Sequence, residues 1–453
     1  MIQAIAILRN LYWGGLSRLR MLRKRSIPVF KRYARVPGSL SGEKRPSQFA
    51  GRKLILITWE FPPHVTGGVY RPLSFARHAA ASGWQVEVIC GPAPSTPNHA
   101  GRYLADLLPE SVPVHRVATD QGPHPWPLPK IDGGIVNALA LYEAATRRIG
   151  PGGSGVILAS GPPFCNFVAG LWLARRTGWR LALDYRDEWT ETPFRFVATD
   201  GANRDWEARC LARADLVIFT TPSQLAHAER RFGELAHNRH AVVYNGWEPG
   251  DFAASPVVVQ KDPAAPITLA YLGNLGAMAA PDAFLDTLAR ALAACPDLRT
   301  RLKVRLVGHK RPDALDKLRS FPYPEVIELL ETIPKTDACR MMREVDGLLL
   351  LNPPGLARYI QGKLYEYIAA GTPILSFGSG GEMGEIILSL GAGMTITEDD
   401  ADGLAEALLR LRDFPTVGEE ARTAWLASRE RAKLARTLYQ ELDTLIAAPV
   451  TAD

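Results

Sequence analysis

Short apolar runs alternate with amphipathic stretches along most of this chain. Apolar runs bounded by turn residues are typical of buried parallel strands, and apolar positions three or four residues apart are typical of helices. In the first half, strands are predicted over 54–58, 85–90, 114–117, 156–159, 179–183, 216–220 and 241–244. Helices are predicted between them over 73–81, 135–148, 164–176 and 223–232. This alternation predicts a parallel sheet covered by helices.

A second series of the same kind follows. Strands are predicted over 267–272, 304–307, 326–330, 347–351 and 374–377. Helices are predicted over 282–294, 312–318, 336–344, 404–411 and 417–447, with a short helix before Gly371 and Pro373, which end it. The fold class is therefore α/β, with two Rossmann-like doubly wound domains facing a central cleft. The predicted divisions are a basic segment (1–50), a first domain (51–248), a linker (249–265), a second domain (266–415) and a helical tail (416–453) packing back on the first domain.

The positive charge lies at the N-terminus. The 453 residues carry a net charge of +6, but residues 1–50 hold eleven Lys or Arg against one acid, so the rest is slightly acidic. Nucleic-acid binding by the folded body is therefore not expected. The apolar residues of this segment are too interrupted to span a membrane. Either it forms a basic helix on an anionic membrane surface, or it is a leader with incidental charge.

The five cysteines are scattered and have no spacing typical of a disulfide framework or a zinc site. They are Cys90, Cys165, Cys210, Cys295 and Cys339. We expect small core residues in a reducing compartment, and no metal.

Two candidate sites follow strands of the first half. Gly67 and Gly68 come after the first strand, at the edge where open α/β sheets bind ligands, and would let the backbone approach a phosphate or sugar. The alternative is an ordinary turn, and the absence of GxGxxG disfavours a dinucleotide. Asp187 follows a later strand and could position a hydroxyl or act as a base. Arg186 could equally be its structural partner.

The second half contains a matching glycine turn and a helix that bears charges. Gly273 and Asn274 follow its first strand, and Lys310 follows its second. Lys363 and Glu366 lie on the short helix, where burying an unpaired acid would be costly. This helix is either the wall of a ligand site or an ordinary surface helix. Glycine turns in both halves suit a ligand with a diphosphate, clamped between domains that close on it.

Five motifs in this order resemble GT-B glycosyltransferases of the retaining family 4 type, especially those of bacterial surface-polysaccharide biosynthesis. The motifs are Phe61-Pro62-Pro63 with Gly67-Gly68 and Arg71, Ser160 with Pro162-Pro163, Arg186-Asp187-Glu188-Trp189, Asn245-Gly246, and Gly362-Lys363-Leu364-Tyr365-Glu366-Tyr367 with Ala370-Gly371-Thr372-Pro373. The similarity covers roughly residues 52–415.

This resemblance implies transfer of a sugar from a nucleotide-sugar donor to a hydroxyl of a glycan or lipid-linked saccharide. It implies retention of the anomeric configuration, no metal and no cofactor beyond the donor substrate. The second domain would bind the donor, with Glu366 on the ribose hydroxyls, and the first domain the acceptor, with Gly67-Gly68 near the diphosphate. Catalysis would rest on stabilising the departing diphosphate. We expect a cytoplasmic protein, peripheral on the inner face of the cell membrane.

The sequence departs from the family pattern at the diphosphate. The acid that usually precedes Glu366 by eight positions is Arg358, and the turn at Gly273 lacks the usual Arg and Lys. A degenerate, donor-binding subunit and a nucleotide-sugar epimerase of the same fold are therefore the alternatives. We assign catalysis to Asp187, Arg186 and Lys363. We assign donor binding to Gly67, Gly68, Gly273, Asn274, Lys310, Arg358, Lys363 and Glu366.

Overall fold

The computed structural model describes residues 52–118, 130–149, 154–253, 264–276, 279–415 and 418–448, together with 29, 31–36, 128 and 262. The chain forms two compact units. Unit 1 contains the described residues up to Phe219, Ala228–Ala241 and those from Leu438 onward. Unit 2 contains Thr220–His227 and Val242–Thr437. Most of the segment 1–50, including its predicted membrane-surface helix, lies outside the described residues.

Unit 1 is built on a seven-stranded sheet in the order β3-β2-β1-β4-β5-β6-β7. The strands are β1 (Lys53–Thr58), β2 (Gln85–Cys90), β3 (Val114–Arg116), β4 (Val156–Gly161), β5 (Arg180–Tyr185), β6 (Leu216–Phe219) and β7 (Arg239–Val242). β1 pairs in parallel with both β2 and β4, so the order of strands reverses at this point. Ligands of such sheets bind at the carboxyl ends of the strands beside the reversal.

Unit 2 repeats this topology with six strands in the order β10-β9-β8-β11-β12-β13. They are β8 (Ile267–Leu272), β9 (Leu302–Val307), β10 (Ile327–Leu330), β11 (Gly347–Asn352), β12 (Ile374–Gly378) and β13 (Gly393–Ile396). β8 pairs in parallel with β9 and β11, which places the reversal between β8 and β11. The predicted α/β fold with two Rossmann-like, doubly wound halves is confirmed.

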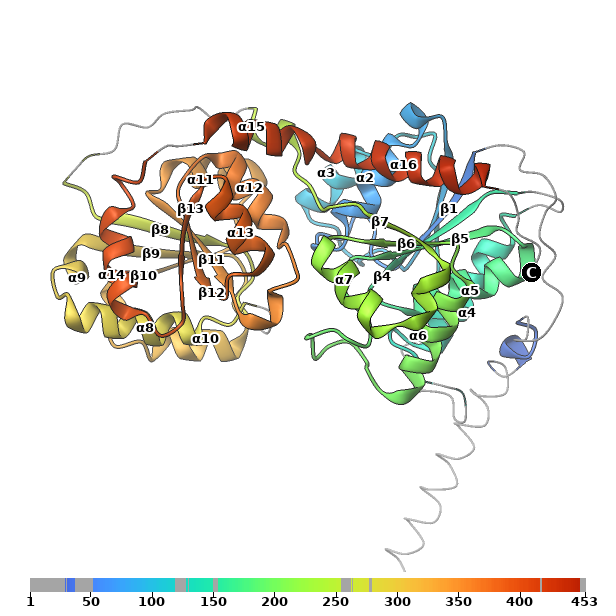
Figure 1. Cartoon of the computed structure of the whole chain (residues 1–453), viewed down its shortest axis with the longest axis horizontal. Helices are drawn as coiled ribbons and strands as arrows, with labels where there is room; N and C mark the ends of the chain where they lie inside the picture. The colour runs from blue at the N-terminus through green and yellow to red at the C-terminus, as the bar shows by residue number, and fades with distance from the viewer. Residues whose placement is uncertain are drawn as a thin grey trace, which may run out of the picture. The chain divides into compact units, whose positions relative to one another are not determined.

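Helices cover both faces of each sheet (Figure 1). In chain order they are α2 (Tyr70–His78), α3 (His99–Asp106), α4 (Ile135–Thr146), α5 (Cys165–Thr177), α6 (Gly201–Arg213), α7 (Pro222–Arg231), α8 (Asp282–Ala294), α9 (Leu298–Arg301), α10 (Pro312–Arg319), α11 (Lys335–Glu344), α12 (Gly362–Ala370), α13 (Gly381–Ser389), α14 (Ala401–Arg410), α15 (Glu419–Ser428) and α16 (Arg431–Ala447). Short 3-10 helices include η3 (Pro249–Phe252) and η5 (Pro354–Leu356).

Several elements were not predicted, namely α3, α6, α9, α13 and β13. In α6 the buried side chains include Trp206 and Cys210, one turn apart, but charged residues on the outer face hide this apolar spacing. α13 begins in a glycine-rich stretch for which the sequence predicts no helix. Its Met383 and Ile387 are buried, so packing against the sheet stabilises a helix that glycine disfavours locally. η3 likewise lies inside the predicted linker.

The tail contacts both units through different segments. α15 packs on α12, where the rings of Trp425 and Tyr365 stack with centroids 5.3 Å apart. The part of α16 from Leu438 onward belongs to unit 1. There the Tyr439 hydroxyl donates a hydrogen bond of 2.7 Å to the carbonyl of Phe75. The sequence predicts that the tail packs back on the first domain, and the contact of α15 with α12 is an additional one that it does not predict.

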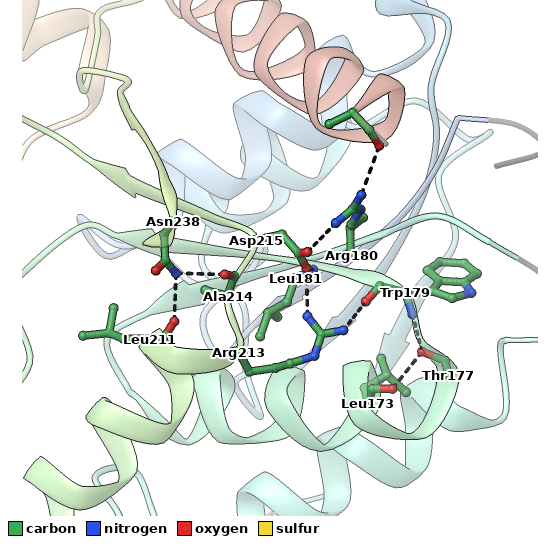
Figure 2. A network of polar contacts seen from close by, with 11 residues as sticks. Leu173, Thr177, Trp179, Arg180, Leu181, Leu211, Arg213, Ala214, Asp215 and Asn238 are labelled. Atoms are coloured by element: carbon green, nitrogen blue, oxygen red, sulfur yellow. Dashed lines mark hydrogen bonds and ion pairs between the residues drawn. The ribbon is translucent and has the colours of Figure 1, made fainter. Parts of the chain in front are cut away.

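A buried ion-pair network closes the amino-terminal edge of the unit 1 sheet (Figure 2). The Asp215 carboxylate accepts hydrogen bonds from Arg180 Nη1 at 2.7 Å and from Arg213 Nη1 at 2.8 Å. Arg180 also donates to the carbonyl of Ala448 at 3.1 Å, at the end of the described tail. This network lies at the edge opposite the carboxyl ends of the strands, where we expect the site.

Candidate functional site

Local contacts fix helix α12 beside the strand reversal of unit 2. The side-chain amide of Gln361, just before the helix, donates to the carbonyl of Leu351 at 2.7 Å. Gly371 ends the helix in the left-handed conformation, with φ of 76°. The hydroxyl of the buried Tyr367 accepts a hydrogen bond from the backbone N–H of Leu272 at 3.0 Å. This contact joins α12 to the carboxyl end of β8.

Lys363 projects from α12 to the glycine turn after β8. Its Nζ lies 3.8 Å from the centre of the Tyr271 ring. Gly273 has φ of 144°, and a Cβ at this position would lie 3.0 Å from the same Nζ. Burial lowers the pKa of Lys363 to about 7, opposed by the charge of Glu366. The structure therefore brings together the predicted residues Lys363 and Gly273. Asn274 joins them because its carbonyl accepts a hydrogen bond from the Tyr271 hydroxyl at 3.0 Å.

Glu366 is paired with a residue that the sequence does not suggest. Its Oε1 accepts a hydrogen bond from Lys335 Nζ, at the start of α11. Lys335 Nζ also lies 3.9 Å from Asp251 Oδ2 on η3. Burial alone would lower the pKa of Lys335, but Glu366 and Asp251 outweigh it and raise that pKa. The acid that the sequence places in the helix is thus satisfied by an ion pair.

Two other residues proposed for donor binding, Lys310 and Arg358, make contacts that involve a backbone carbonyl. Lys310 Nζ donates to the carbonyl of Leu330, and burial lowers the pKa of Lys310. The carbonyl of Arg358 accepts a hydrogen bond from the hydroxyl of Thr221 at 2.7 Å. For these two residues a role in donor binding stays a prediction. Lys363 is the predicted cation that lies directly at Gly273.

Arg186 fixes the loops at the strand reversal of unit 1. Its Nε donates to the carbonyl of Gly161 at 3.2 Å, and its other nitrogens donate to the carbonyls of Gly68 and Pro162. A Cβ at Gly68 would lie 2.5 Å from Arg186 Nη1 and from Glu60 Oε2, whereas a Cβ at Gly67 would meet nothing within 4 Å. The structure therefore brings Arg186 and Gly68 together, and the contacts of Arg186 organise the backbone.

Two aspartates near Arg186 differ in environment. Asp184 is fully buried and accepts hydrogen bonds from Arg71 Nη2 at 2.7 Å and from the Ser160 hydroxyl at 2.7 Å. Asp187 is half-buried. Burial raises the pKa of Asp187 to about 6, against the attraction of Arg186. Asp184 thus has structural partners, and Asp187 is the carboxylate suited to exchange a proton near neutral pH.

Sequence reasoning missed Glu60, Asp251, Tyr271 and Lys335. Lys335 and Glu366 are 31 positions apart, so no local pattern could pair them. Asp251 lies in a stretch without periodicity. Tyr271 could have been noticed as an aromatic residue near the end of a strand that precedes a glycine turn.

Within the described residues, no group of three or more His, Cys, Asp or Glu side chains could hold a metal ion. The part of the chain that the structure describes also contains no helix long and apolar enough to cross a membrane. The predicted absence of a metal requirement stays a prediction.

Comparison with known proteins agrees with this organisation. Residues 66–246 match the family model described as "Glycosyl transferase 4-like domain", and residues 266–413 match the model "Glycosyl transferases group 1". The chain is 24% identical over 432 residues to a protein named glycogen synthase from Mycobacterium tuberculosis, with 88% of this chain and 93% of that protein covered.

Solved structures share the fold. Sucrose-phosphate synthase from Thermosynechococcus elongatus superposes with a TM-score of 0.64 at 17% identity, covering 87% of this chain and 99% of that one. A structure described as trehalose-6-phosphate from E. coli bound with UDP-2-fluoro glucose gives a TM-score of 0.62 at 12% identity, with coverages of 86% and 98%.

Proposed function

Since the chain belongs to the GT-B glycosyltransferases with family 4-like and group 1 domains, we propose that it moves a sugar from a nucleotide-sugar donor to a hydroxyl of a glycan or lipid-linked saccharide in polysaccharide biosynthesis. We propose retention of the anomeric configuration and no metal. The proposed donor site depends on one observation. Lys363 and Glu366 lie on one helix, at the carboxyl end of β8.

The two charges of α12 suit different parts of the donor. A carboxylate such as Glu366 accepts hydrogen bonds from the two hydroxyls of a ribose. Lys363, beside the turn at Gly273, suits the diphosphate, whose negative charge grows as the bond to the sugar breaks. The pKa of about 7 for Lys363 lets a bound diphosphate draw a proton onto this nitrogen. Binding and charge stabilisation therefore come from the same helix.

Asp187 suits the acceptor. In the proposed reaction the acceptor oxygen forms a bond to the anomeric carbon while the bond to the diphosphate breaks, and the hydroxyl proton passes to a base. A half-buried carboxylate with a pKa of about 6 is ionised at neutral pH and can orient this hydroxyl. Arg186 supports the same loops through its contacts with three carbonyls.

The membrane proposal rests on the basic and apolar residues of the segment 1–50, of which the structure describes 29 and 31–36. The Tyr33 ring meets the Trp172 ring edge to face, with centroids 6.0 Å apart, and Arg32 pairs with Glu143 at 2.8 Å. Lys31 and Arg35 are exposed. These contacts join Arg32 and Tyr33 to unit 1. Replacing Arg23, Lys24 and Arg25 together by Ser should reduce binding to vesicles containing anionic phosphatidylglycerol, and unchanged binding would refute this assignment.

The function is tested by incubating the full chain with a panel of nucleotide sugars and glycan or lipid-linked acceptors. We expect acceptor-dependent release of nucleoside diphosphate for one donor, and its loss in Asp187→Asn. Analysis of the product's anomeric configuration tests retention, and unchanged turnover in the presence of a chelator tests metal independence. If no donor is turned over and no nucleoside diphosphate binds, the proposal is refuted.

A binding subunit without turnover is the second candidate. It is favoured by Arg358 in place of an acid and by the absence from the sequence of the Gly273 turn of the Arg and Lys that the family pattern has there. This candidate predicts tight binding of a nucleotide sugar with no product from any acceptor. Conversion of the donor in the absence of acceptor would instead indicate an epimerase of the same fold.

A further inference from the structure

Three charged side chains from separate segments of unit 2 meet at Glu366, the residue proposed to bind the ribose. They are Asp251 on η3, Lys335 on α11 and Glu366 on α12. Their side chains are 13%, 32% and 16% exposed, so water reaches them only in part. One ammonium thus lies between two carboxylates.

The helix that carries Lys335 is held from both sides. The hydroxyl of Thr372, just after α12, donates to the carbonyl of Met342 on α11 at 2.6 Å. Arg343, also on α11, lies over the Phe252 ring of η3 with 5.1 Å from its Cζ to the ring centre. Because α11 is fixed to both neighbouring segments, the position of Lys335 beside Glu366 is also fixed.

Lys335 contacts one of the two oxygens of the Glu366 carboxylate. Lys335 Nζ donates to Oε1 of Glu366, and within the described part of the chain Oε2 accepts no hydrogen bond. A hydrogen bond between two charged groups is stronger and more directional than a neutral one. Lys335 can therefore hold the carboxylate in one orientation and leave acceptor capacity for a ligand.

We infer that Lys335, supported by Asp251, is a positioning residue that orients Glu366 for a ribose and so sets the preference for ribonucleotides over 2′-deoxyribonucleotides. This inference rests on the proposed function, because it assigns a partner to the donor site. Lys335 itself touches no reacting atom. Its effect acts through the geometry of Glu366, which accepts the ribose hydroxyls.

The test compares pairs of ligands that differ by one hydroxyl. The full chain is titrated calorimetrically with UDP, GDP and ADP, and with dUDP, dGDP and dADP. For the diphosphate that binds best, the ratio of deoxy to ribo Kd is measured. We expect a ratio of about tenfold or more in the native chain, the range for a hydrogen bond to a charged group. Glu366→Gln should reduce it severalfold.

Lys335→Met should lower this ratio about as far as Glu366→Gln, whereas Lys335→Arg should keep most of it. In the double variant Lys335→Met/Glu366→Gln the ratio should fall no further than in either single variant, because the two residues act through one contact. Lys317→Met is the control, since Lys317 is 60% exposed and pairs with Asp282 on the surface. A purely structural role for Lys335 would weaken both ligands of a pair equally.

Each outcome has a distinct meaning. If Glu366→Gln lowers the ratio and Lys335→Met does not, the inference is overturned and the donor site stands. If neither variant changes the ratio, the ribose assignment of Glu366 fails with it. If no nucleoside diphosphate binds the native chain, the proposed function itself fails. If circular dichroism shows that Lys335→Met is unfolded, the ratio of deoxy to ribo Kd is measured in Lys335→Gln instead. An unchanged ratio in that variant overturns the inference.

Discussion

Lys363 and Lys310 show how strongly the surroundings of a residue decide its chemistry. Both are lysines near glycine turns at the carboxyl edge of unit 2, and the sequence offers both as phosphate ligands. Lys310 Nζ donates to a backbone carbonyl, whereas Lys363 lies over the Tyr271 ring beside Gly273. Burial lowers the pKa of both lysines, and that of Lys363 falls to about 7, so Lys363 changes charge near neutral pH.

We predict that binding of a nucleoside diphosphate takes up a proton at Lys363. Free Lys363, with a pKa of about 7, is mostly neutral at pH 8, and a nearby diphosphate would raise that pKa. Affinity should therefore fall as the pH rises above about 7. Calorimetry at pH 8 in two buffers of different ionisation enthalpy measures the uptake. Lys363→Met should abolish it, and equal uptake in that variant would exclude Lys363 as its source.

We predict a catalytic loss without a binding loss for Asp187→Asn. The pKa of Asp187 is about 6, so activity of the native chain should rise with pH through about 6 as the carboxylate ionises. Asp187→Asn should lower kcat by about 10²-fold or more, the usual contribution of a general base. Asp205→Asn, in an exposed ion pair with Arg209, is the control. Native kcat in Asp187→Asn would exclude this role.

At the scale of elements, the loop after β1 shows that two adjacent glycines can differ. Gly68 lies against Arg186 and Glu60, and its carbonyl is one of the three that Arg186 contacts. Gly67 faces open space. The glycine pair that the sequence singles out therefore contains one residue required by packing and one that is not.

We predict that Gly68→Ala destabilises unit 1 by about 1–3 kcal/mol, because its methyl group would displace the buried Arg186 guanidinium. Gly67→Ala should be close to neutral, since a Cβ at this position meets no atom within 4 Å. Urea unfolding followed by circular dichroism compares the two. Equal loss of stability in both variants would contradict the packing explanation.

At the scale of the whole molecule, stability and function occupy opposite edges of the unit 1 sheet. The Asp215 network closes the amino-terminal edge and holds the end of the described tail through Arg180 (Figure 2). The proposed acceptor residue Asp187 follows β5 at the other edge. A change in the network should therefore affect unfolding of unit 1 more than it affects chemistry.

We predict that Asp215→Ala destabilises unit 1 by about 3–5 kcal/mol, because it leaves two buried guanidinium groups without this carboxylate. Asp205→Ala removes an exposed pair and should change stability by less than about 1 kcal/mol. Thermal unfolding measures both. Binding of a nucleoside diphosphate to Asp215→Ala below its unfolding temperature should remain native. A native melting temperature in this variant would refute the prediction.

Much of the fold could be predicted because buried parallel strands consist of short apolar runs, which can be recognised in the sequence. The strand predicted over 267–272 has the same bounds in the structure, and the helix of Lys363 and Glu366 ends at Gly371 as the sequence predicts. α6 and α13 were missed because their stability comes from one buried face rather than from a clear periodicity. Local sequence cannot report how much surface a helix will bury elsewhere.

The sequence by itself determined the two α/β series, the glycine turns after their first strands, and the acid and lysine on the helix before Gly371. These features depend on spacing and backbone conformation, which are local properties. Only the tertiary structure decided that Lys335 and Asp251 meet Glu366, that Arg186 joins the loops after β1 and β4, and that Lys363 Nζ lies beside Gly273. Such pairings join residues far apart in the chain, and the electrostatics that follow depend on burial, which arises only when the elements pack.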